Sequence, residues 1–320
     1  MTRRALVCGV LGQDGSYLAE QLLARDYSVT GTTRDSAKAS DRSEMPSTVD
    51  AIDIVTMQPT DFRSVLSIVE RTRPDEIYAL AGQSSVGYSF EEPAETLKSI
   101  VFGILNILEA VRTAAPAARV YHASSSECFG DLKGWPATET TPFDPRSPYG
   151  VAKSSAHMLV RNYREAYGLF ASNGLLFNHE SPRRPARFVT RKIIDGAARI
   201  ARGDGSRLVL GNLDIVRDWG WAPEYTDAMW RILQADAPDD FIIATGESRS
   251  LSDFTAAAFA IHGLDWRSHV DIDARLGRPS DLAWSGADPS RAAALLGWRA
   301  SARMDEVVRR MASNLEGSAE

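Results

Sequence analysis

The sequence predicts an α/β protein in which a doubly wound parallel sheet is followed by a smaller C-terminal α/β cap. Through residue 177, short apolar runs of strand length alternate with longer segments of helical period. The first apolar run leads directly into a glycine-rich turn. After residue 177 the alternation lapses into segments rich in Arg, Pro, Gly and Trp. We therefore expect residues 1–177, with a returning segment at about 218–245, to form the sheet domain, and residues 178–217 and 246–320 to form the cap.

Each expected strand is a short apolar run, and each expected helix is a longer amphipathic segment. In chain order, the predicted strands are residues 5–10, 28–33, 49–54, 76–81, 119–124, 170–177 and 241–245. The predicted helices are residues 15–25, 61–73, 100–113, 149–167 and 190–202. Because the two kinds of element alternate, the strands should be parallel. Residues 36–46 are polar and small and are expected to form an exposed loop.

Composition narrows the possible classes of protein. The 320 residues include 36 Lys and Arg against 42 Asp and Glu, a net charge of −6 without a basic stripe, so we expect no nucleic-acid partner. No stretch approaches the roughly 18 apolar residues of a membrane span. The two cysteines, Cys8 and Cys128, and the five histidines show no metal-ligand spacing. We therefore expect a soluble, cytoplasmic protein that holds no metal and binds no membrane.

The turn after the first strand has the pattern GxxGxxG, formed by Gly9, Gly12 and Gly15, with Gln13 and Asp14 before the third glycine. Glycines permit a tight turn and let the backbone approach a pyrophosphate closely. The free N–H groups and the dipole of the following helix then stabilise the phosphate charge. A strand, this turn and a helix in succession predict a Rossmann-type dinucleotide site.

The end of the second strand bears on which dinucleotide is bound. NAD-binding proteins usually place an acidic residue there to hold the ribose 2′-OH. Here Arg34 comes first, and a guanidinium suits a 2′-phosphate. We therefore predict NADP, while the neighbouring Asp35 keeps NAD as the alternative.

Two short segments carry residues of catalytic types. The fifth strand ends in Ser124-Ser125-Ser126-Glu127, and the next helix contains Tyr149 and Lys153. Residues four apart share one face of a helix, so these side chains can converge with those at the strand end. The combination is typical of a hydride-transfer site with an additional acid/base.

Alcohol oxidation at neutral pH needs a phenolate, although a phenol has a pKa near about 10. One ammonium at about 4 Å supplies about 4 kcal/mol at an effective dielectric near 20, which would lower a pKa by about three units. We therefore expect Lys153 to lower the pKa of Tyr149.

Longer strings in the chain resemble the GDP-mannose 4,6-dehydratase family of the extended short-chain dehydrogenase/reductase superfamily. The glycine turn and YxxxK fix only the superfamily, whereas residues 13–18 (QDGSYL), 178–184 (NHESPRR) and 217–220 (RDWG) are more specific. The resemblance covers nearly the whole chain. It implies a Rossmann domain that binds NADP, a cap that binds GDP-mannose or a related nucleotide sugar, and a homodimer or homotetramer.

The resemblance also implies catalytic roles. Tyr149 would take the proton of the sugar C4 hydroxyl during hydride transfer to NADP, Ser125 would bind the C4 oxygen, and Lys153 would hold the nicotinamide ribose. Glu127 would remove the C5 proton and assist loss of the C6 hydroxyl as water, after which hydride returns to C6. An epimerase or reductase needs no such carboxyl, so the prediction of a dehydratase depends on Glu127.

Two sets of binding residues follow from the same resemblance. The cofactor set is Gly9, Gly12, Gln13, Asp14, Gly15, Arg34, Gln58, Leu80, Ala81, Gln83, Tyr149, Lys153, Asn178, His179 and Arg184. The substrate set is Ser85, Ser125, Glu127, Asn178, Thr190, Lys192, Arg217 and Arg278. Planar guanidinium groups in the second set suit recognition of a diphosphate by paired hydrogen bonds.

The chain departs from the family pattern in three places. Ser125 replaces a Thr and keeps the hydroxyl. Gln58-Pro59 replaces an Asp-Leu pair that contacts the adenine, and Asp35 follows Arg34 where a pair of arginines commonly reaches a neighbouring subunit. The alternatives are an NADP-dependent reductase or epimerase of a GDP-linked hexose, a dehydratase of a related GDP-heptose, and a catalytically silent nucleotide sensor. The intact Ser, Tyr and Lys set argues against the last.

Overall fold

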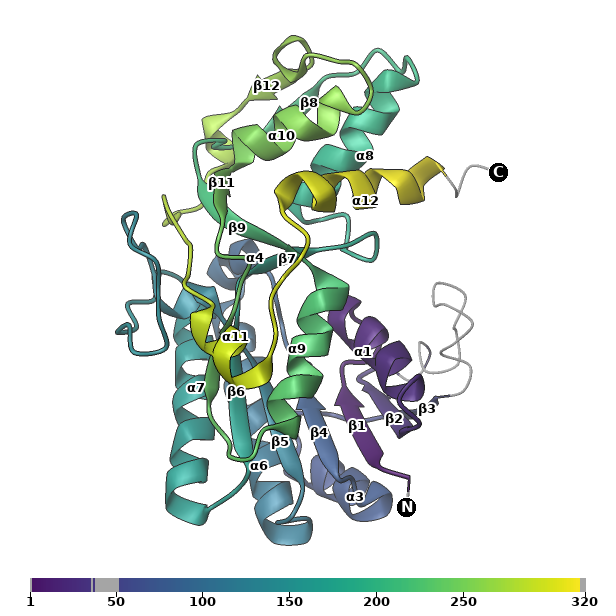
Figure 1. The fold of residues 1–320 in the computed structure, drawn as a ribbon, viewed down its shortest axis with the longest axis vertical. Coiled ribbons are helices and arrows are strands. Elements are labelled where there is room, and N and C mark those ends of the chain that lie inside the picture. The colour runs from purple at the N-terminus through teal and green to yellow at the C-terminus, as the bar shows by residue number, and fades with distance from the viewer. Residues whose placement is uncertain (1, 36, 38–51, 317–320) are drawn as a thin grey trace.

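The computed structural model describes residues 2–35, 37 and 52–316. Within these ranges, seven strands form one parallel sheet in the order β10-β6-β5-β4-β1-β2-β3 (Figure 1). The strands are β1 (Arg4–Cys8), β2 (Ser28–Thr33), β3 (Asp53–Thr56), β4 (Glu76–Ala79), β5 (Arg119–Ser125), β6 (Ala171–Leu176) and β10 (Asp240–Ile243). The predicted doubly wound sheet is confirmed. The order runs from β1 in two directions, and such a switch point is where open α/β sheets bind ligands.

All seven predicted strands have counterparts in this sheet. β2 has the predicted bounds, and β5 and β6 differ from the prediction by one residue at one or both ends. β3 begins at Asp53. Residues 49–51 of the predicted third strand, and the predicted loop 36–46 apart from residue 37, lie outside the described residues.

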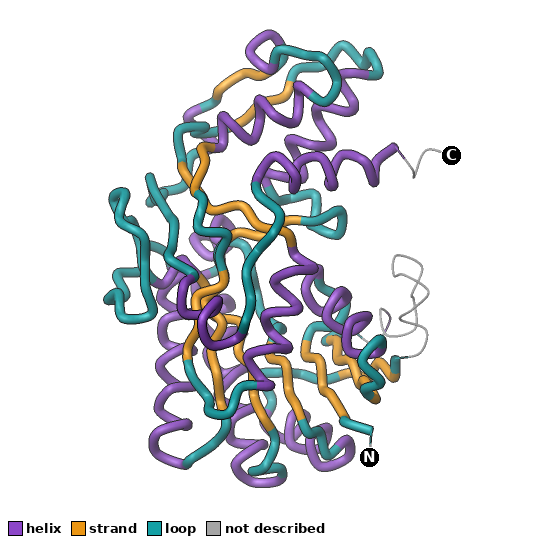
Figure 2. Tube along the Cα trace, in the orientation of Figure 1, coloured by secondary structure: helices purple, strands orange, loops and turns teal. Residues whose placement is uncertain are grey.

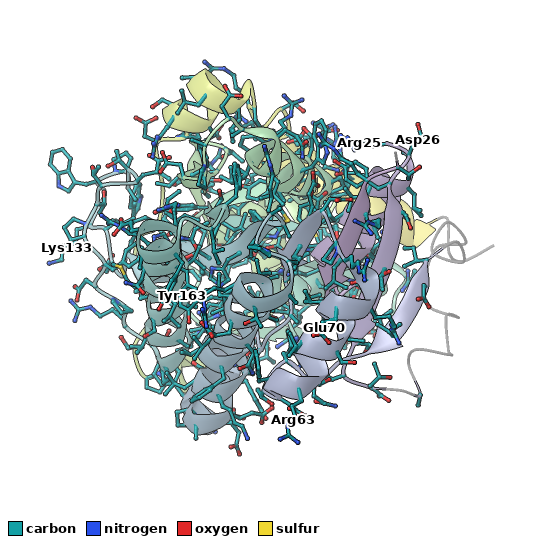
Figure 3. All side chains as sticks on the ribbon, turned by 90° about the horizontal axis from the view of Figure 1, so that it is seen from below. Arg25, Asp26, Arg63, Glu70, Lys133 and Tyr163 are labelled. Carbon is teal, nitrogen blue, oxygen red and sulfur yellow. The ribbon has the colours of Figure 1, made fainter. Side chains whose placement is uncertain are left out.

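Helices cover both faces of the sheet. One face carries α3 (Phe62–Thr72), α6 (Gly103–Ala114) and α7 (Pro148–Tyr167), and the other carries α1 (Gln13–Leu23), α9 (Ala222–Gln234) and α11 (Ser290–Leu296). Successive side chains of β1 alternate between the two cores, with Val7 under α1 and α9 and Leu6 on the opposite face. Tyr163, labelled in Figure 3, donates from its hydroxyl to Glu109 (2.6 Å) and joins α7 to α6.

The segment before α6 is irregular. The chain forms α4 (Val86–Glu91), α5 (Pro93–Leu97) and a π-helical turn, η2 (Lys98–Phe102), before it enters α6. The prediction of a regular helix over residues 100–113 was therefore wrong at its beginning. The spacing of apolar residues in a single π-helical turn is close to that in an α-helix, so the sequence pattern does not distinguish the two.

The cap lies above the carboxyl ends of the large sheet (Figures 1 and 2). It contains a three-stranded sheet, β11-β9-β7, and a two-stranded sheet, β12-β8. Their bounds are β7 (Asn178–Glu180), β8 (Leu208–Leu210), β9 (Val216–Trp221), β11 (Ser248–Ser250) and β12 (Val270–Ile272). The helices α8 (Val189–Ala201), α10 (Leu251–Ala260) and α12 (Met304–Glu316) pack around a separate apolar core that includes Phe254, Phe259 and Met311.

The segment between β9 and β11 connects the two regions. In the predicted returning segment, α9 packs on α1 and β10 pairs with β6, while β9 pairs with β7 and β11 in the cap. Residues 216–245 therefore contribute to both sheets. None of the helices in the described ranges combines the length and hydropathy that a membrane crossing requires.

Candidate active site

A cleft of about 410 Å³ opens where the carboxyl ends of the sheet strands meet the cap. The sheet side contributes residues that follow β1, β4, β5 and β6, and the cap side contributes residues of α8 and β9. Most predicted site residues line this cleft: Asp14, Leu80, Ser85, Ser125, Glu127, Tyr149, Lys153, Asn178, His179, Arg184, Thr190, Arg217 and Arg278. Residues far apart in the sequence thus meet at the switch point of the sheet.

The end of β5 and the beginning of α7 bring the four predicted catalytic residues together. Ser125 ends β5, and its Oγ accepts a hydrogen bond from the Glu127 N–H (3.2 Å) in the short 3₁₀ turn η3 (Ser126–Cys128). α7 begins beside that turn, because a Cβ on Gly150 would lie 2.8 Å from the Glu127 carbonyl oxygen. Ser147 caps the helix by accepting from the Gly150 N–H (3.0 Å). Glycine at position 150 is therefore needed for Tyr149 to approach Glu127.

Lys153 lies on the same side of α7 as Tyr149. Its Nζ donates to the Ala123 carbonyl oxygen (2.7 Å) and lies 5.8 Å from the centroid of the Tyr149 ring. Burial lowers the pKa of Lys153 to about 8. Burial also raises the pKa of Tyr149, and the Ser125 hydroxyl and the Arg184 charge only partly oppose it. The expectation that Tyr149 has a low pKa is therefore wrong for the protein by itself, because burial of the phenol sets the direction of the shift.

Glu127 faces cationic side chains from the cap. Burial raises the pKa of its carboxyl, while Arg217 and Arg278 act in the opposite direction. Arg217 is 4% exposed and donates to Asp281 (3.4 Å), and Arg278 forms an ion pair with the same carboxylate (3.7 Å). The cap thus places two positive charges near the carboxyl without pairing it directly, which leaves Glu127 able to exchange a proton.

A buried carboxylate that sequence reasoning missed organises the next part of the cleft. Glu180, 1% exposed, accepts from the Thr190 hydroxyl (2.6 Å) and pairs with Nε of Arg184 (3.1 Å). The Arg184 guanidinium also stacks on the ring of Phe188, 3.9 Å from its centroid. Glu180 lies inside the NHESPRR string, so the sequence did indicate this segment. Only its burial in the structure shows that Glu180 holds Thr190 and Arg184 in place.

The glycine turn is tied to the first strand of the cap. Asp14 accepts from His179 Nε2 (3.0 Å to Oδ2), and Gln13 donates to the His179 carbonyl oxygen (3.2 Å). Although burial acts against the charged form, His179 lowers the pKa of Asp14 to about 2, and Asp14 in turn raises the pKa of His179. Ser181 donates to Gln13 Oε1 (2.8 Å). The specific strings 13–18 and 178–184 therefore contact each other directly.

The geometry of the glycine turn fits a dinucleotide. Gly9 has φ 87°, and a Cβ on Gly15 would lie 2.3 Å from the Gly9 carbonyl oxygen. Gly12 is the N-cap of α1 and brings no side chain over the first N–H groups of that helix. Backbone N–H groups at the start of α1 can therefore receive a pyrophosphate. The fold and the turn would therefore hold a nicotinamide dinucleotide.

Several predicted cofactor residues lie beside the cleft rather than in its lining. These are Gly9, Gly12, Gln13, Gly15, Arg34, Gln58, Ala81 and Gln83. Arg34 is exposed at the end of β2, and Gln58 donates to its carbonyl oxygen (3.1 Å). Gln83 donates to the carbonyl oxygen of Ser85 (2.8 Å) and so holds the turn before α4.

Lys192 is the predicted substrate residue that the structure does not bring to the cleft lining. Successive residues of a helix differ by about 100° in direction, so Lys192 points about 200° away from Thr190. Its Nζ donates to the Val209 carbonyl oxygen (2.7 Å), and the side chain borders a separate surface groove with Arg191, Asp195 and Arg199. Conversely, Arg187, Trp219 and Leu276 line the cleft and were not predicted. Leu276 lies in a segment without periodicity, so no pattern indicated it.

Three features define the class of protein. The sheet is doubly wound, a dinucleotide turn meets a Ser, Tyr and Lys set at its switch point, and a cationic cap covers them. These features are those of the extended short-chain dehydrogenases/reductases. Comparison with known proteins agrees. UDP-glucose 4-epimerase of Thermus thermophilus, solved in complex with NAD, superposes with a TM-score of 0.86 at 25% identity and covers 98% of this chain and 99% of its own. A UDP-glucose 4-epimerase of Thermotoga maritima has a TM-score of 0.88 at 23% identity and shows the same fold.

Comparison of sequences identifies the family within this superfamily. The family model for GDP-mannose 4,6 dehydratase matches residues 6–311. GDP-mannose 4,6 dehydratase 1 of Arabidopsis thaliana is 43% identical over 96% of this chain and 88% of its own length. The human GDP-mannose 4,6 dehydratase is 40% identical over 96% of this chain and 90% of its own. This chain belongs to the GDP-mannose 4,6-dehydratase family.

Proposed function

We propose that this chain converts GDP-mannose to GDP-4-keto-6-deoxymannose and water, with NADP as a cofactor that is regenerated in each turnover. The observation that carries the proposal is Glu127, a carboxyl with a raised pKa in the same cleft as Ser125, Tyr149 and Lys153. Hydride transfer needs only the last three residues. Elimination of water between C5 and C6 needs a further acid/base, and Glu127 supplies it.

The first stage oxidises C4. The Ser125 hydroxyl binds the C4 oxygen, and Tyr149 Oη takes the proton of the C4 hydroxyl. Because burial keeps the Tyr149 phenol protonated in the protein by itself, this step needs positive charge nearby, and Lys153 is the cation one turn away on α7. Acceptance of hydride from C4 and its return to C6 are the chemistry that bound NADP supplies.

The second stage removes water. The new C4 ketone acidifies the C5 proton, which the Glu127 carboxylate takes and then delivers to the departing C6 hydroxyl. After hydride has reached C6, C5 regains a proton, and this balances the one that Tyr149 took from the C4 hydroxyl. Glu127 can both take up the C5 proton and give it to the C6 hydroxyl, because the raised pKa of its carboxyl lies closer to neutrality than that of a free glutamate.

Charge in the cleft supports a nucleotide diphosphate as the substrate's common part. Its lining contains the cations Lys153, Arg184, Arg187, Arg217 and Arg278 against the carboxylates Asp14, Glu127 and Glu180. Glu180 and Asp14 already have partners in Arg184 and His179. Arg187 and Arg278 are therefore the guanidinium groups best placed for phosphate oxygens.

NADP rather than NAD is supported by the end of β2. Arg34 is exposed there, while the carboxylate of Asp35 accepts a hydrogen bond from the Ala37 N–H (2.9 Å). Asp35 is thus turned toward its own backbone and is less available to a ribose hydroxyl. The exposed guanidinium of Arg34 suits the 2′-phosphate.

A homodimer is part of the proposal. Val151 and Met158 are 43% and 50% exposed and lie seven residues apart on α7, so they share one face, and Phe102, 53% exposed, precedes the adjoining α6. An apolar stripe over two packed helices suits a second copy of the chain. Light scattering should give a dimer mass, and Met158→Glu should shift it toward the monomer. A monomeric wild-type protein would contradict this part.

The activity itself is tested with purified protein and GDP-mannose in the absence of added NADPH. Mass spectrometry should show loss of one water from the nucleotide sugar, with catalytic amounts of NADP sufficient. Consumption of stoichiometric NADPH would instead indicate a reductase, and an isomer of unchanged mass would indicate an epimerase. A panel that includes a GDP-linked heptose distinguishes the sugar.

A further inference from the structure

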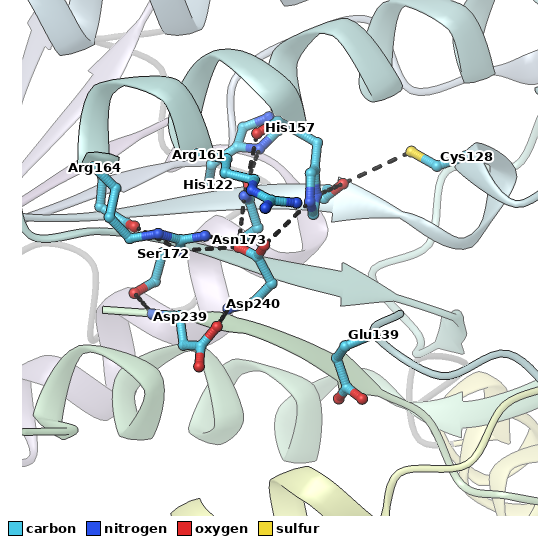
Figure 4. Close-up of polar contacts among 12 residues, drawn as sticks. His122, Cys128, Glu139, His157, Arg161, Arg164, Ser172, Asn173, Asp239 and Asp240 are labelled. Atoms are coloured by element: carbon cyan, nitrogen blue, oxygen red, sulfur yellow. Dashed lines mark hydrogen bonds and ion pairs between the residues drawn. The ribbon is translucent and has the colours of Figure 1, made fainter. Parts of the chain in front are cut away.

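A chain of buried polar groups runs beneath the cleft and is used by none of the steps above. His157 of α7 lies at its centre, 5% exposed. Its Nδ1 lies 3.2 Å from Ser124 Oγ, and its Nε2 lies 3.3 Å from Asp240 Oδ2. Ser124 Oγ lies 3.8 Å from Sγ of the buried Cys128. Figure 4 shows this group between α7 and the strands β5, β6 and β10.

The surroundings of Asp240 set the direction of the hydrogen bonds. Asp240 accepts from both terminal nitrogens of Arg164 (3.0 and 3.1 Å) and from Asn173 Nδ2 (2.9 Å). Although burial acts in the opposite direction, His157 and Arg164 hold the pKa of the Asp240 carboxyl well below its usual range. An ionised carboxylate only accepts, so a proton of the His157 ring lies on Nε2, which faces Asp240, and in that tautomer Nδ1 is the acceptor. The Ser124 hydroxyl is then the donor to Nδ1. Its oxygen stays free to accept from the Cys128 thiol.

Helix α7 contacts two consecutive residues at the end of β5, Ala123 and Ser124. Tyr149, Lys153 and His157 are spaced by four and therefore follow one side of α7. Lys153 donates to the Ala123 carbonyl oxygen (2.7 Å), and His157 binds the next residue, Ser124. Ser124 lines the cleft and directly precedes Ser125. The last residues of β5 are thus fastened to α7 at two successive positions.

We propose that His157 is a positioning residue for the dehydration: through the Ser124 hydroxyl it fixes the end of β5, and with it the placement of Ser125 and Glu127 against Tyr149. Asp240 holds the imidazole in the tautomer that can accept from Ser124. The inference rests on the proposed function, since it assigns a supporting group to that site. Errors of placement of about 1 Å at such a site cost about a hundredfold in rate.

A packing role is the competing explanation. The His157 ring meets the ring of Phe143 edge to face, with centroids 4.9 Å apart. If packing were its whole contribution, substitutions of similar volume would act through stability and would not depend on which nitrogen they imitate. The two explanations therefore differ in what amide substitutions do.

A pair of amide variants separates the two nitrogens. The side-chain amide of His157→Asn lies near the Nδ1 position and can still accept from Ser124, whereas that of His157→Gln reaches toward Asp240 and leaves Ser124 without an acceptor. We expect His157→Gln to lower kcat about tenfold to a hundredfold with KM for GDP-mannose within about twofold, and His157→Asn to recover most of kcat. Ser124→Ala, a mild change that preserves the fold, should reproduce the loss of His157→Gln, and the double variant should add little to it.

Val160→Ala is the matched control, because Val160 is a fully buried residue of α7 outside this polar chain. It should lower the melting temperature and leave kcat nearly unchanged. Equal kcat in His157→Gln and His157→Asn, or full activity in Ser124→Ala, would overturn the inference while the wild-type enzyme still dehydrates GDP-mannose. If the wild-type protein releases no water from GDP-mannose, the proposed function itself fails, and the two failures are thereby distinguished.

Discussion

At the scale of single residues, the site depends on side chains whose ionisation differs from that in water. Glu127 and Tyr149 both have raised pKa values because they are buried, and Lys153 has a lowered one for the same reason. These three residues could be predicted from the sequence, because Glu127 follows the end of a predicted strand and Tyr149 and Lys153 have the YxxxK spacing. The direction of the shift for Tyr149 could not be predicted, because the sequence contains no measure of how deeply the ring is buried.

Glu127→Gln separates the two stages of the reaction. The amide keeps the shape of the side chain but cannot take the C5 proton, so we expect loss of water to fall by about two to four orders of magnitude, the range of general acid–base catalysis. Oxidation at C4 should persist, and isotope exchange at C4 followed by mass spectrometry measures it separately. If both partial reactions fell equally, Glu127 would have a structural role only.

Lys153→Met tests the burial of the ammonium through its effect on stability. In the folded protein the pKa of Lys153 is about 8, below its unfolded value, so the unfolded chain binds more protons between these pKa values and stability rises with pH there. The variant should abolish turnover, be more stable than the wild type at pH 7 by up to about 3 kcal/mol, and lose that advantage above pH about 10.

Chemical denaturation at several pH values measures this. Lys133→Met is the control, because Lys133 is an exposed loop residue at the outer edge of the molecule (Figure 3), and it should leave the pH profile unchanged. A destabilised Lys153→Met at pH 7 would show that the hydrogen bond to Ala123 outweighs the cost of burial.

At the scale of elements, the sequence predicted what long periodic segments encode. α7 was predicted to within one residue, and most of the sheet strands were found because they are short apolar runs. The cap strands β7, β8, β11 and β12 have three residues each, too few to show a period of two. α9 was missed because it follows β9 without intervening turn residues. Glu180 lies in one of these cap strands, β7, whereas Asp281 lies in an irregular segment between η5 (Ala274–Leu276) and α11.

Gly150→Ala tests the contact between α7 and the turn η3. The added Cβ would meet the Glu127 carbonyl oxygen at 2.8 Å, so the helix and the turn must separate. We expect a loss of about 1–3 kcal/mol of stability and at least a tenfold lower kcat. Gly103→Ala in α6 is the control, since its Cβ would meet Pro59 at an ordinary 3.6 Å, and there alanine should be neutral or slightly stabilising. Equal effects of both changes would argue against a specific approach of α7.

At the scale of the whole molecule, the cleft is complete only because two differently built regions meet. The sheet domain supplies Ser125, Tyr149 and Lys153, and the cap supplies Arg217 and Arg278. The chain carries a net charge of −6, yet this junction gathers more cations than carboxylates. The family resemblance predicted a cap that binds the nucleotide sugar. That Lys192 borders a different groove could be seen only from the direction of its side chain on α8.

Arg278→Ala tests the contribution of the cap to substrate binding. The side chain is 37% exposed and pairs with Asp281 only at 3.7 Å, so its loss should leave the melting temperature nearly unchanged. We expect KM for GDP-mannose to rise about tenfold, with a weaker dependence of kcat/KM on salt. Arg275→Ala, three residues earlier and paired with Asp273, is the control and should leave KM unchanged. An unchanged KM in Arg278→Ala would remove it from the substrate site.

The place of β10 at the edge of the large sheet has a consequence for synthesis. Ser124 through His157 leave the ribosome well before Asp240, yet β10 is the strand that completes the sheet beside β6 and supplies the carboxylate facing His157. During translation the nascent chain therefore holds every residue of the catalytic turn while β6 is still an open edge, available to other strands. The sheet is therefore completed only when the last quarter of the chain has been made, and fragments that end before residue 240 are expected to aggregate rather than to catalyse.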